Sequence, residues 1–446
     1  MDFLAAYDAI PESEPARRVA LLRRHMKGDG PALFAELRAG RPVFATPAGV
    51  FVTRMPDVVE VLSTPDVFTV GAYGPVLEEV LHGPFMLARD GADVHWHDRG
   101  HGQLMLPAED FDPVRRLTAR LADSALDRAV TTARGEGRTT FDYIQEYSAP
   151  VAARIAVEYL GFSGVPERTL HDLSRRVQWA VFANPGRDPE VHASGVAAGK
   201  ELHDLVAGVI ARRRAAASAD AGPEPADVLG RMLRTVLPPG TGREMDDERV
   251  NHQLAGYLIG YQQNATQCAA TALKELAARP EALAEAERLA AEPDTGSASE
   301  PAAFDGYVWE ALRFHPFVPS TPRLCVRSHV LAAGTERETR LAAGTVVHAA
   351  MASAMFDEAV VEDPYAFRPD RTPVHNMVLG HGAHDCVGKY PARAILPEMV
   401  RRVLLRPGIR PLPGPEGAMD YAGTPYPQHY TVTAGSAPSP RRAGNG

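Results

Sequence analysis

The segment around Cys386 has the composition of a ligand-binding loop. From Val378 to Arg393 it reads V-L-G-H-G-A-H-D-C-V-G-K-Y-P-A-R, with three glycines around the cysteine. Glycines at such spacing let the backbone turn tightly and approach a flat ligand closely. A helical pattern begins just after the cysteine, and the unpaired N–H groups and positive dipole of a helix N-terminus favour a thiolate. The segment therefore predicts a sulfur that ligates or reacts.

Two other interpretations of this loop are open from the residues alone. A single cysteine in a glycine-rich loop is often a small buried hydrophobic residue without chemistry. His375, His381 and His384 lie close to Cys386 in the sequence and could form a zinc site with it. Their spacing fits no common zinc pattern, which argues against that alternative.

The loop resembles the heme-binding signature of the cytochrome P450 family, F-G-x-G-x-[HR]-x-C-x-G-x-x-x-A. Leu379 stands where the family usually has phenylalanine. The matching residues are Gly380, Gly382, His384, Cys386, Gly388 and Ala392.

The resemblance implies heme b as cofactor, with Cys386 as the axial ligand of the iron and His384 as a contact of a heme propionate. A thiolate ligand directs electron density to heme iron and so favours cleavage of an O–O bond.

Two further motifs stand at the distances that the resemblance implies. Glu310 and Arg313 form E-x-x-R in a helical pattern, where residues i and i+3 share a face. The family joins this pair to an arginine of an F-x-P-x-R segment, here Arg371, in a cluster that braces the heme loop. Arg323 stands where the family has a second propionate-binding arginine, and arginine suits bidentate binding of a carboxylate.

The segment Asp90–His101 occupies the place of the helix that contacts the propionates in the resembled family. Two pairings are possible, His95 with Arg99 or His97 with His101, and Trp96 could also contribute. We list His97, Arg99 and His101 as candidate cofactor contacts. The alternatives are a solvated helix face and a metal site at H-D-R-G-H, which resembles H-E-x-x-H but lacks a third ligand.

The longest predicted helix runs from Asp246 to Ala278 and is apolar almost all round at its centre, which indicates a helix through the middle of the protein. In the resembled family this helix carries [AG]-G-x-[DE]-T above the iron. Counting back from Pro280, the matching residues are Gly260 to Asn264, so that Gln263 replaces the acid and Asn264 replaces the threonine. A shift of this alignment by one or two residues would bring Thr266 closer to the site, but no shift restores the full motif.

Gln263 and Asn264 are therefore candidate catalytic residues with unusual chemistry. Amides donate and accept hydrogen bonds but release no proton near neutral pH, unlike an acid–alcohol pair that relays protons. Water or the substrate could supply the protons, hydrogen peroxide could replace oxygen, or the substrate could already contain the bond to be rearranged. In the alternative without catalysis, the two amides only satisfy helix carbonyls or each other.

The periodicity of the chain predicts a mainly α fold with minor β structure, and the resemblance implies the cytochrome P450 fold with heme between the central helix and the Cys386 loop. Further helices are predicted at 31–38, 57–62, 114–129, 149–160, 197–214, 227–236 and 303–314. Strands are predicted at 42–45, 50–53, 324–326, 329–332, 341–342 and 346–350. Residues 218–225, 238–242 and 293–301 are predicted surface loops. We expect one domain over 1–435 and a disordered tail over 436–446.

Composition excludes several classes of protein. A net charge of −9 without basic blocks argues against nucleic-acid binding, and the 3 cysteines argue against a disulfide scaffold. No apolar run is long enough for a signal peptide, an anchor or a membrane span. We expect a cytoplasmic monomer.

The first functional hypothesis is a heme-thiolate monooxygenase or peroxygenase of an apolar small molecule, such as an intermediate of secondary metabolism. Its electrons would come from a separate ferredoxin and reductase, or peroxide would replace them, and Phe85–Leu87 with Leu258 and Ile259 would line the substrate site. The second is a heme-dependent isomerase or lyase that needs no external electrons. The third is a heme protein that binds a gas or ligand without catalysis.

Overall fold

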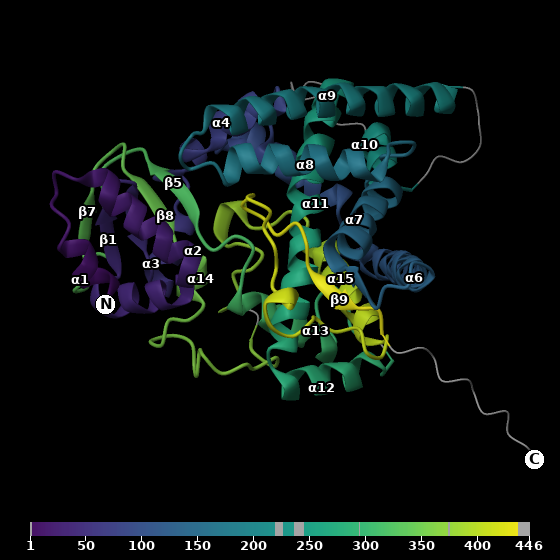
Figure 1. Ribbon diagram of the computed structural model, residues 1–446. Helices are drawn as coiled ribbons and strands as arrows, with labels where there is room; N and C mark the ends of the chain where they lie inside the picture. The colour runs from purple at the N-terminus through teal and green to yellow at the C-terminus, as the bar shows by residue number, and fades with distance from the viewer. Residues whose placement is uncertain (1, 219–225, 236–244, 294, 373–374, 436–446) are drawn as a thin grey trace, which may run out of the picture.

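The structure is a computed structural model that describes residues 2–218, 226–235, 245–293, 295–372 and 375–435. The loop predicted at 238–242, nearly all of that at 218–225 and the tail 436–446 lie outside the described residues. The chain is predominantly helical, as predicted (Figure 1). No helix of the described residues is both long and apolar enough to cross a membrane.

Helix α11, Asp247–Ala277, runs through the middle of the helical part (Figure 1). The side chain of Asp246 caps it by accepting a hydrogen bond from the backbone N–H of Arg249 at 2.8 Å. Its residues are buried on nearly every side, which confirms the prediction of a central helix from its apolar sequence. Helices α8, Glu167–Phe182, and α9, Pro189–Ser218, lie across its upper part in Figure 1.

The other helices surround α11 or cover the sheet. They are α1 (Phe3–Asp8), α2 (Pro15–Gly40), α3 (Met55–Ser63), α4 (Gly74–Leu81), α5 (His97–Met105), α6 (Phe111–Gly135), α7 (Ala149–Ile155), α10 (Val228–Arg234), α12 (Pro280–Ala290), α13 (Ala303–Phe314), α14 (Met351–Ala354) and α15 (Lys389–Leu404). The predicted helix 149–160 continues beyond α7 as a π-helical segment, Ala156–Leu160.

Helix α2 is longer than the predicted helix 31–38 and contains a break. Asp29 has the non-helical angles φ −148° and ψ 75°, and its carboxylate accepts a hydrogen bond from Ala32 N at 3.0 Å. Asp29 thus caps a second helical stretch that has Pro31 in its first turn. The prediction found this second stretch and missed the first.

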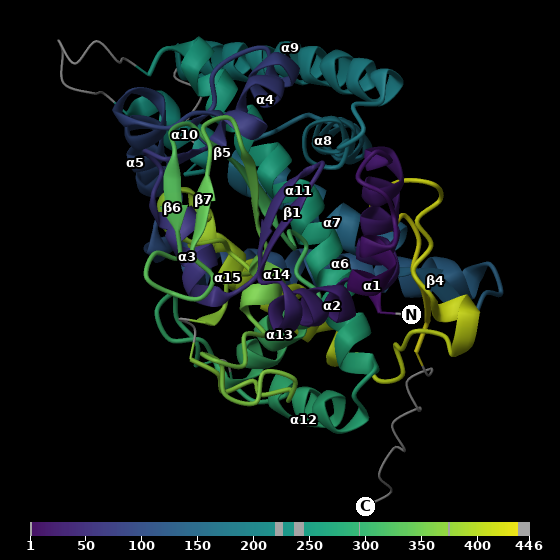
Figure 2. The ribbon, with the colours of Figure 1, turned by 90° about the vertical axis from the view of Figure 1, so that its left-hand side faces the viewer.

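The main sheet has five strands in the order β1-β2-β8-β5-β3 and lies to one side of the helices, facing the viewer in Figure 2. Its strands are β1 (Val43–Thr46), β2 (Gly49–Val52), β8 (Val346–Ala349), β5 (Thr321–Cys325) and β3 (Phe68–Thr69). Only β2 and β8 pair in parallel. Two small antiparallel sheets pair β4 (Thr140–Asp142) with β9 (Thr431–Thr433) and β6 (His329–Leu331) with β7 (Thr339–Leu341).

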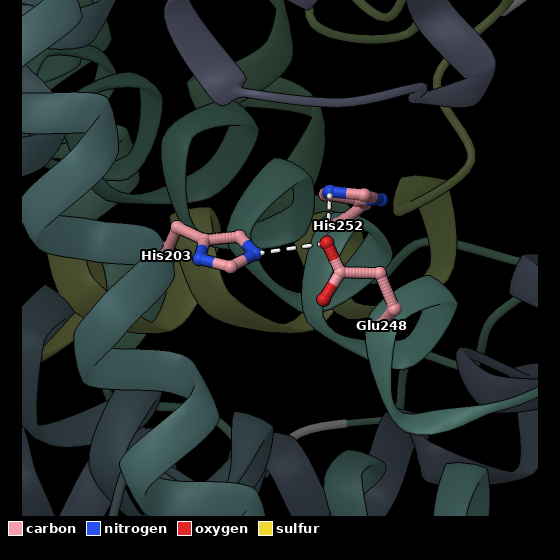
Figure 3. A group of neighbouring side chains, drawn as sticks. All are labelled: His203, Glu248 and His252. Atoms are coloured by element: carbon pink, nitrogen blue, oxygen red, sulfur yellow. Dashed lines mark hydrogen bonds and ion pairs between the residues drawn. The ribbon is translucent and has the colours of Figure 1, made fainter.

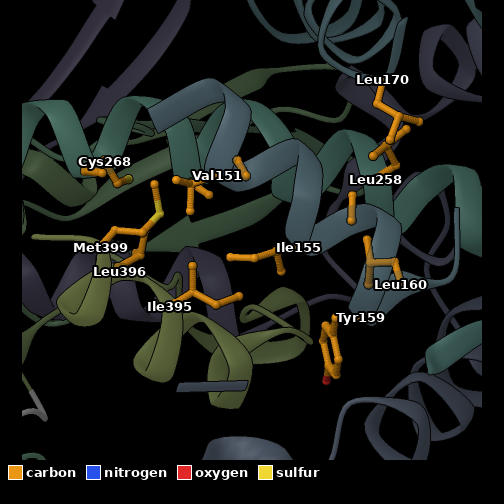
Figure 4. Close-up of a cluster of buried hydrophobic side chains, with 14 of the residues drawn as sticks. Val151, Ile155, Tyr159, Leu160, Leu170, Leu258, Cys268, Ile395, Leu396 and Met399 are labelled. Carbon is orange, nitrogen blue, oxygen red and sulfur yellow. The ribbon is translucent and has the colours of Figure 1, made fainter. Parts of the chain in front are cut away.

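The largest hydrophobic core packs α7, α8, α11 and α15 together (Figure 4). Val151 and Ile155 of α7 meet Ile395 and Met399 of α15 there, and Leu258 of α11 lies near Leu170 of α8. These side chains are almost fully buried, so α11 and α15 are held in fixed positions on either side of the cysteine loop.

Candidate heme site

The loop before α15 depends on two glycines in left-handed conformations, Gly380 with φ +79° and Gly382 with φ +74°. A Cβ atom at position 382 would lie 2.1 Å from the carbonyl oxygen of Leu62 at the end of α3. Only glycine permits this close approach. The backbone N–H of Cys386 donates to the carbonyl oxygen of Leu379 at 2.8 Å and closes the loop.

The sulfur of Cys386 lies directly before α15 and accepts a hydrogen bond from the backbone N–H of Gly388. Burial raises the pKa of the Cys386 thiol, while that N–H group, Arg99 and Lys389 lower it. Burial is the largest of these effects and favours the neutral thiol. Coordination to a metal ion would favour the thiolate instead, because a coordinating thiol is deprotonated.

The π-helical turn Ala92–Trp96 meets this loop through His95, and the start of α5 meets it through Arg99. Arg99 donates to the carbonyl oxygen of Asp385 at 2.7 Å and also pairs with its carboxylate. The ring of His95 lies 2.9 Å from the carbonyl oxygen of Ala383 and 2.9 Å from that of Met86. Of the two pairings that the sequence allowed, the structure thus brings His95 and Arg99 to the loop.

His97 and His101 form no hydrogen bond with this loop among the described residues. His97 faces the first turn of α11, with its Nδ1 atom 3.1 Å from the guanidinium of Arg249 and 3.1 Å from the carboxylate of Asp98. His101 is buried, and neither of its ring nitrogens has a hydrogen-bond partner among the described residues. His97, predicted from the sequence as a cofactor contact, therefore faces Arg249, and Trp96 is half exposed.

His384 and Arg323 belong to a polar cluster at the edge of the loop. The Nε2 atom of His384 lies 2.9 Å from the carboxylate of Asp90, and its ring centroid is 4.0 Å from that of His95. Arg323 on β5 is buried, donates to Thr321 and Pro322, and forms a hydrogen bond with Tyr73.

The partners Asp90, Tyr73 and Asp385 were not among the site residues predicted from the sequence. The first two come from segments more than 230 residues before the loop or strand that they contact, so no local pattern could reveal them. The Nδ1 atom of His384 is buried without a partner in the described part of the chain, and burial lowers the pKa of this ring to about 4.

Glu310, Arg313 and Arg371 meet in one buried ion cluster. Arg313 donates to both carboxylate oxygens of Glu310 at 2.8 Å, and Nε of Arg371 reaches the same carboxylate at 3.2 Å. Arg313 also donates to the carbonyl oxygens of Met355 and Pro364, which fixes the chain that leads to the cysteine loop.

On α11, the side chains of Gln263 and Asn264 point in different directions. Gln263 is buried, and its amide nitrogen lies 3.2 Å from Nδ1 of His171 on α8. Asn264 donates to the carbonyl oxygen of Gly260 at 2.7 Å and accepts a hydrogen bond from Gln178 at 3.2 Å. Asn264 thus satisfies a carbonyl of its own helix, the alternative that the sequence left open.

Thr266 and Tyr261, which lie near this pair on α11, do not replace the acid and alcohol that would relay protons. Thr266 is buried and donates to the carbonyl oxygen of Gln262 at 2.8 Å. The hydroxyl of Tyr261 is buried and has no partner among the described residues. Gly260 itself is exposed, and a Cβ atom there would meet nothing within 4 Å. The helix therefore leaves open space beside Gly260 and Asn264.

The zinc alternatives fail on geometry. Among the described residues, neither His97 with His101 nor the histidines near Cys386 form a group of three ligands close enough to share a metal ion. The residues instead fit a heme: the Cys386 sulfur backed by a helix N-terminus, and at the edge of the loop buried arginines and a histidine nitrogen that has no partner among the described residues.

A family model described as Cytochrome P450 matches residues 174–413, just over half of the chain. The chain belongs to the cytochrome P450 family. This cytochrome P450 is 25% identical over 383 residues to the steroid C26-monooxygenase of Mycolicibacterium smegmatis, covering 84% of each chain. It is 25% identical over 399 residues to the cyclooctat-9-en-7-ol 5-monooxygenase of Streptomyces melanosporofaciens, covering 82% of each.

Solved cytochrome P450 structures share the fold. The open form of EryK from S. erythraea has a TM-score of 0.74 at 21% identity, over 93% of this chain and 98% of that chain. Substrate-free CYP109E1 from Bacillus megaterium has a TM-score of 0.73 at 19% identity, over 91% and 98%. The mainly α fold predicted for this cytochrome P450 is confirmed, and the protein is an oxidoreductase whose cofactor is heme b.

Proposed function

We propose that this cytochrome P450 is a heme-thiolate monooxygenase with Cys386 as the axial ligand. The observation that carries the proposal is the position of the Cys386 sulfur, directly before α15 in a loop that lies close to the end of α3, to Arg99 of α5 and to Arg323 of β5. Heme b bound through a thiolate supplies oxygen activation.

The residues around the loop divide into two groups. Arg99, Arg323 and His384 would hold the heme propionates, because they place cationic or hydrogen-bonding nitrogens at one edge of the loop. Glu310, Arg313 and Arg371 would fix the backbone before the loop and do not touch the cofactor. On this proposal residues 1–435 act as one heme-binding domain.

The substrate would be an apolar small molecule. The names of two relatives refer to a steroid and to cyclooctat-9-en-7-ol, and both compounds are largely hydrocarbon. Phe85 lies against α11 at Gly256, with its ring centroid 6.3 Å from that of Tyr257, and could form one wall of the site. Leu258, which we expected in that wall, packs into the core beside Leu170 instead (Figure 4).

A second candidate is turnover with hydrogen peroxide. It is favoured because Gln263 is turned to His171 and Asn264 to the Gly260 carbonyl, and neither amide can deliver a proton in place of the acid and alcohol. Peroxide brings its own protons and electrons. A separate ferredoxin and reductase are needed only for the first candidate.

The first experiment is the absorption spectrum of the purified protein, reduced and exposed to carbon monoxide. A strongly red-shifted Soret band that Cys386→Ser abolishes would support the thiolate ligand. Cys325→Ser is the matched control, because Cys325 is a buried cysteine of β5 that donates to the carbonyl oxygen of Arg327, a hydrogen bond that a serine hydroxyl can also donate. A normal band in Cys386→Ser would overturn the proposal.

A second experiment separates the two candidates. Steroids and terpene alcohols are screened for a shift of the Soret band, and those that bind are incubated with a ferredoxin–reductase system or with hydrogen peroxide alone. Oxygenated product only with the reductase supports the monooxygenase, and product with peroxide alone supports the second candidate. A rearranged product in the absence of both would instead show an isomerase or lyase.

A further inference from the structure

His203 of α9 and Glu248 and His252 of α11 form a compact group at the junction of the two helices (Figure 3). One ligand atom from each lies within 4.8 Å of the others. Among the described residues, this is the one set of three histidine, cysteine or carboxylate side chains with that property. It lies on α9 and on the first turns of α11, apart from the cysteine loop.

The distances within the group match a coordination shell. The Nε2 atom of His203 lies 3.1 Å from Oε1 of Glu248, and Nε2 of His252 lies 3.3 Å from the same oxygen. Two ligands of a tetrahedral zinc ion, each at about 2.0–2.1 Å from the metal, are about 3.3–3.4 Å apart. Glu248 and His252 are four residues apart and share one face of α11.

His252 is already placed as a ligand. Its side chain is only 7% exposed, and its Nε2 atom points into the group without a hydrogen-bond partner in the described residues. Its ring forms a hydrogen bond with the backbone of His82, the kind of contact that orients histidine ligands of metals.

The ring of His252 is held in place by its packing. A Cβ atom at Gly83 would lie 2.0 Å from Nε2 of His252, so the ring fills the space that a side chain at position 83 would need. Glu248 by contrast is 62% exposed, which leaves a route for an ion from solvent.

We propose that His203, Glu248 and His252 bind a divalent zinc-type transition-metal ion, with water completing the shell. Two imidazole nitrogens and one carboxylate oxygen are a ligand set that zinc commonly takes. The ion would connect the middle of α9 to the start of α11 and stabilise the folded state in proportion to its occupancy. An ordinary network of ion pairs would give the same contacts but bind no metal.

The test uses the untagged, heme-loaded full chain, treated with a chelator, desalted and titrated with Zn²⁺. Isothermal titration calorimetry and elemental analysis should give one zinc per chain, counted separately from iron, and zinc should raise Tm by a few degrees. Glu248→Gln and His203→Gln should each lose this zinc and the Tm shift while the Soret band and circular dichroism stay unchanged.

His192→Gln is the matched control. His192 lies on the same helix α9, and its Nε2 atom is likewise 3.1 Å from a glutamate oxygen, that of Glu79, but among the described residues no second histidine completes a group there. The His192→Gln variant should bind zinc as the wild type does. The proposal is overturned if the wild type binds no stoichiometric zinc, or if Glu248→Gln and His203→Gln retain it. Cys386→Ser should keep the zinc, which separates this test from that of the heme ligand.

Discussion

Arg99 of α5 donates a hydrogen bond from Nη1 to the carbonyl oxygen of Asp385, the residue before Cys386, at 2.7 Å. Its other terminal nitrogen pairs with the carboxylate of the same residue. One buried guanidinium thus holds both the backbone and the side chain next to the cysteine. Arginine suits this role because its planar fork offers two parallel donors.

Loss of Arg99 should therefore weaken heme retention. We expect Arg99→Gln to release heme roughly 10-fold to 100-fold faster, since a charged hydrogen bond contributes about 1.5–3 kcal/mol. Transfer of heme to apomyoglobin, followed in the Soret band, measures the rate. His97→Gln should stay close to the wild type because His97 faces Arg249. Equal acceleration in both variants would contradict the assignment of His95 and Arg99 to the loop.

The ion cluster of Glu310, Arg313 and Arg371 should contribute strongly to the free energy of unfolding. The Arg313 side chain is 2% exposed. Its removal would leave the buried Glu310 carboxylate with Arg371 as its one remaining cationic partner among the described residues. We expect Arg313→Ala to lower the free energy of unfolding by about 3–5 kcal/mol, measured by urea denaturation. Arg288→Ala is the control, because Arg288 is 56% exposed and pairs with Glu285 and Glu292 at the surface. A loss of similar size in the control would refute the prediction.

The burial of His171 beside Gln263 should make stability depend on pH. Burial lowers the pKa of His171 to about 4, from 6.5 in the unfolded chain. As the pH falls below about 6.5 the unfolded chain takes up a proton first, so the contribution of His171 falls until about pH 4 and then levels off.

His171→Asn keeps an acceptor for Gln263 and removes this titration. We expect the wild type to lose about 1–3 kcal/mol more than the variant between neutral pH and about pH 4. Urea denaturation at several pH values measures the difference, and comparison with the variant cancels the other histidines. Parallel curves for the two proteins would show that His171 is not the group responsible.

The residue at position 264 should control how much product is formed for each reducing equivalent consumed. Asn264→Thr places an alcohol beside Gly260, and the helix accommodates it, as Thr266 shows by donating to the carbonyl oxygen of Gln262. On the monooxygenase proposal, we expect several-fold more product per reducing equivalent with a reductase system and little change with peroxide. Asn264→Ala removes the amide without adding an alcohol and should show no such gain. If threonine and alanine behave alike, proton delivery does not pass through this position.

The sequence alone was sufficient where a motif is contiguous or follows one helical face. The glycines, His384 and Cys386 lie within a few residues of one another, so their order predicted the loop. Glu310 and Arg313 are three residues apart on one helix, a spacing that predicts a pair without knowledge of the fold. The central helix α11 followed from apolar residues on all of its sides.

Tertiary structure alone decided which of several equivalent residues face the loop and which distant residues meet. A π-helical turn, Ala92–Trp96, precedes α5 and shifts the register in which His95, His97 and Arg99 face their neighbours. Sequence periodicity cannot detect such a turn, because each residue rotates a helix face by about 100° and one extra residue changes the outcome. The group of His203, Glu248 and His252 was likewise beyond the sequence, since it forms only where α9 packs on α11.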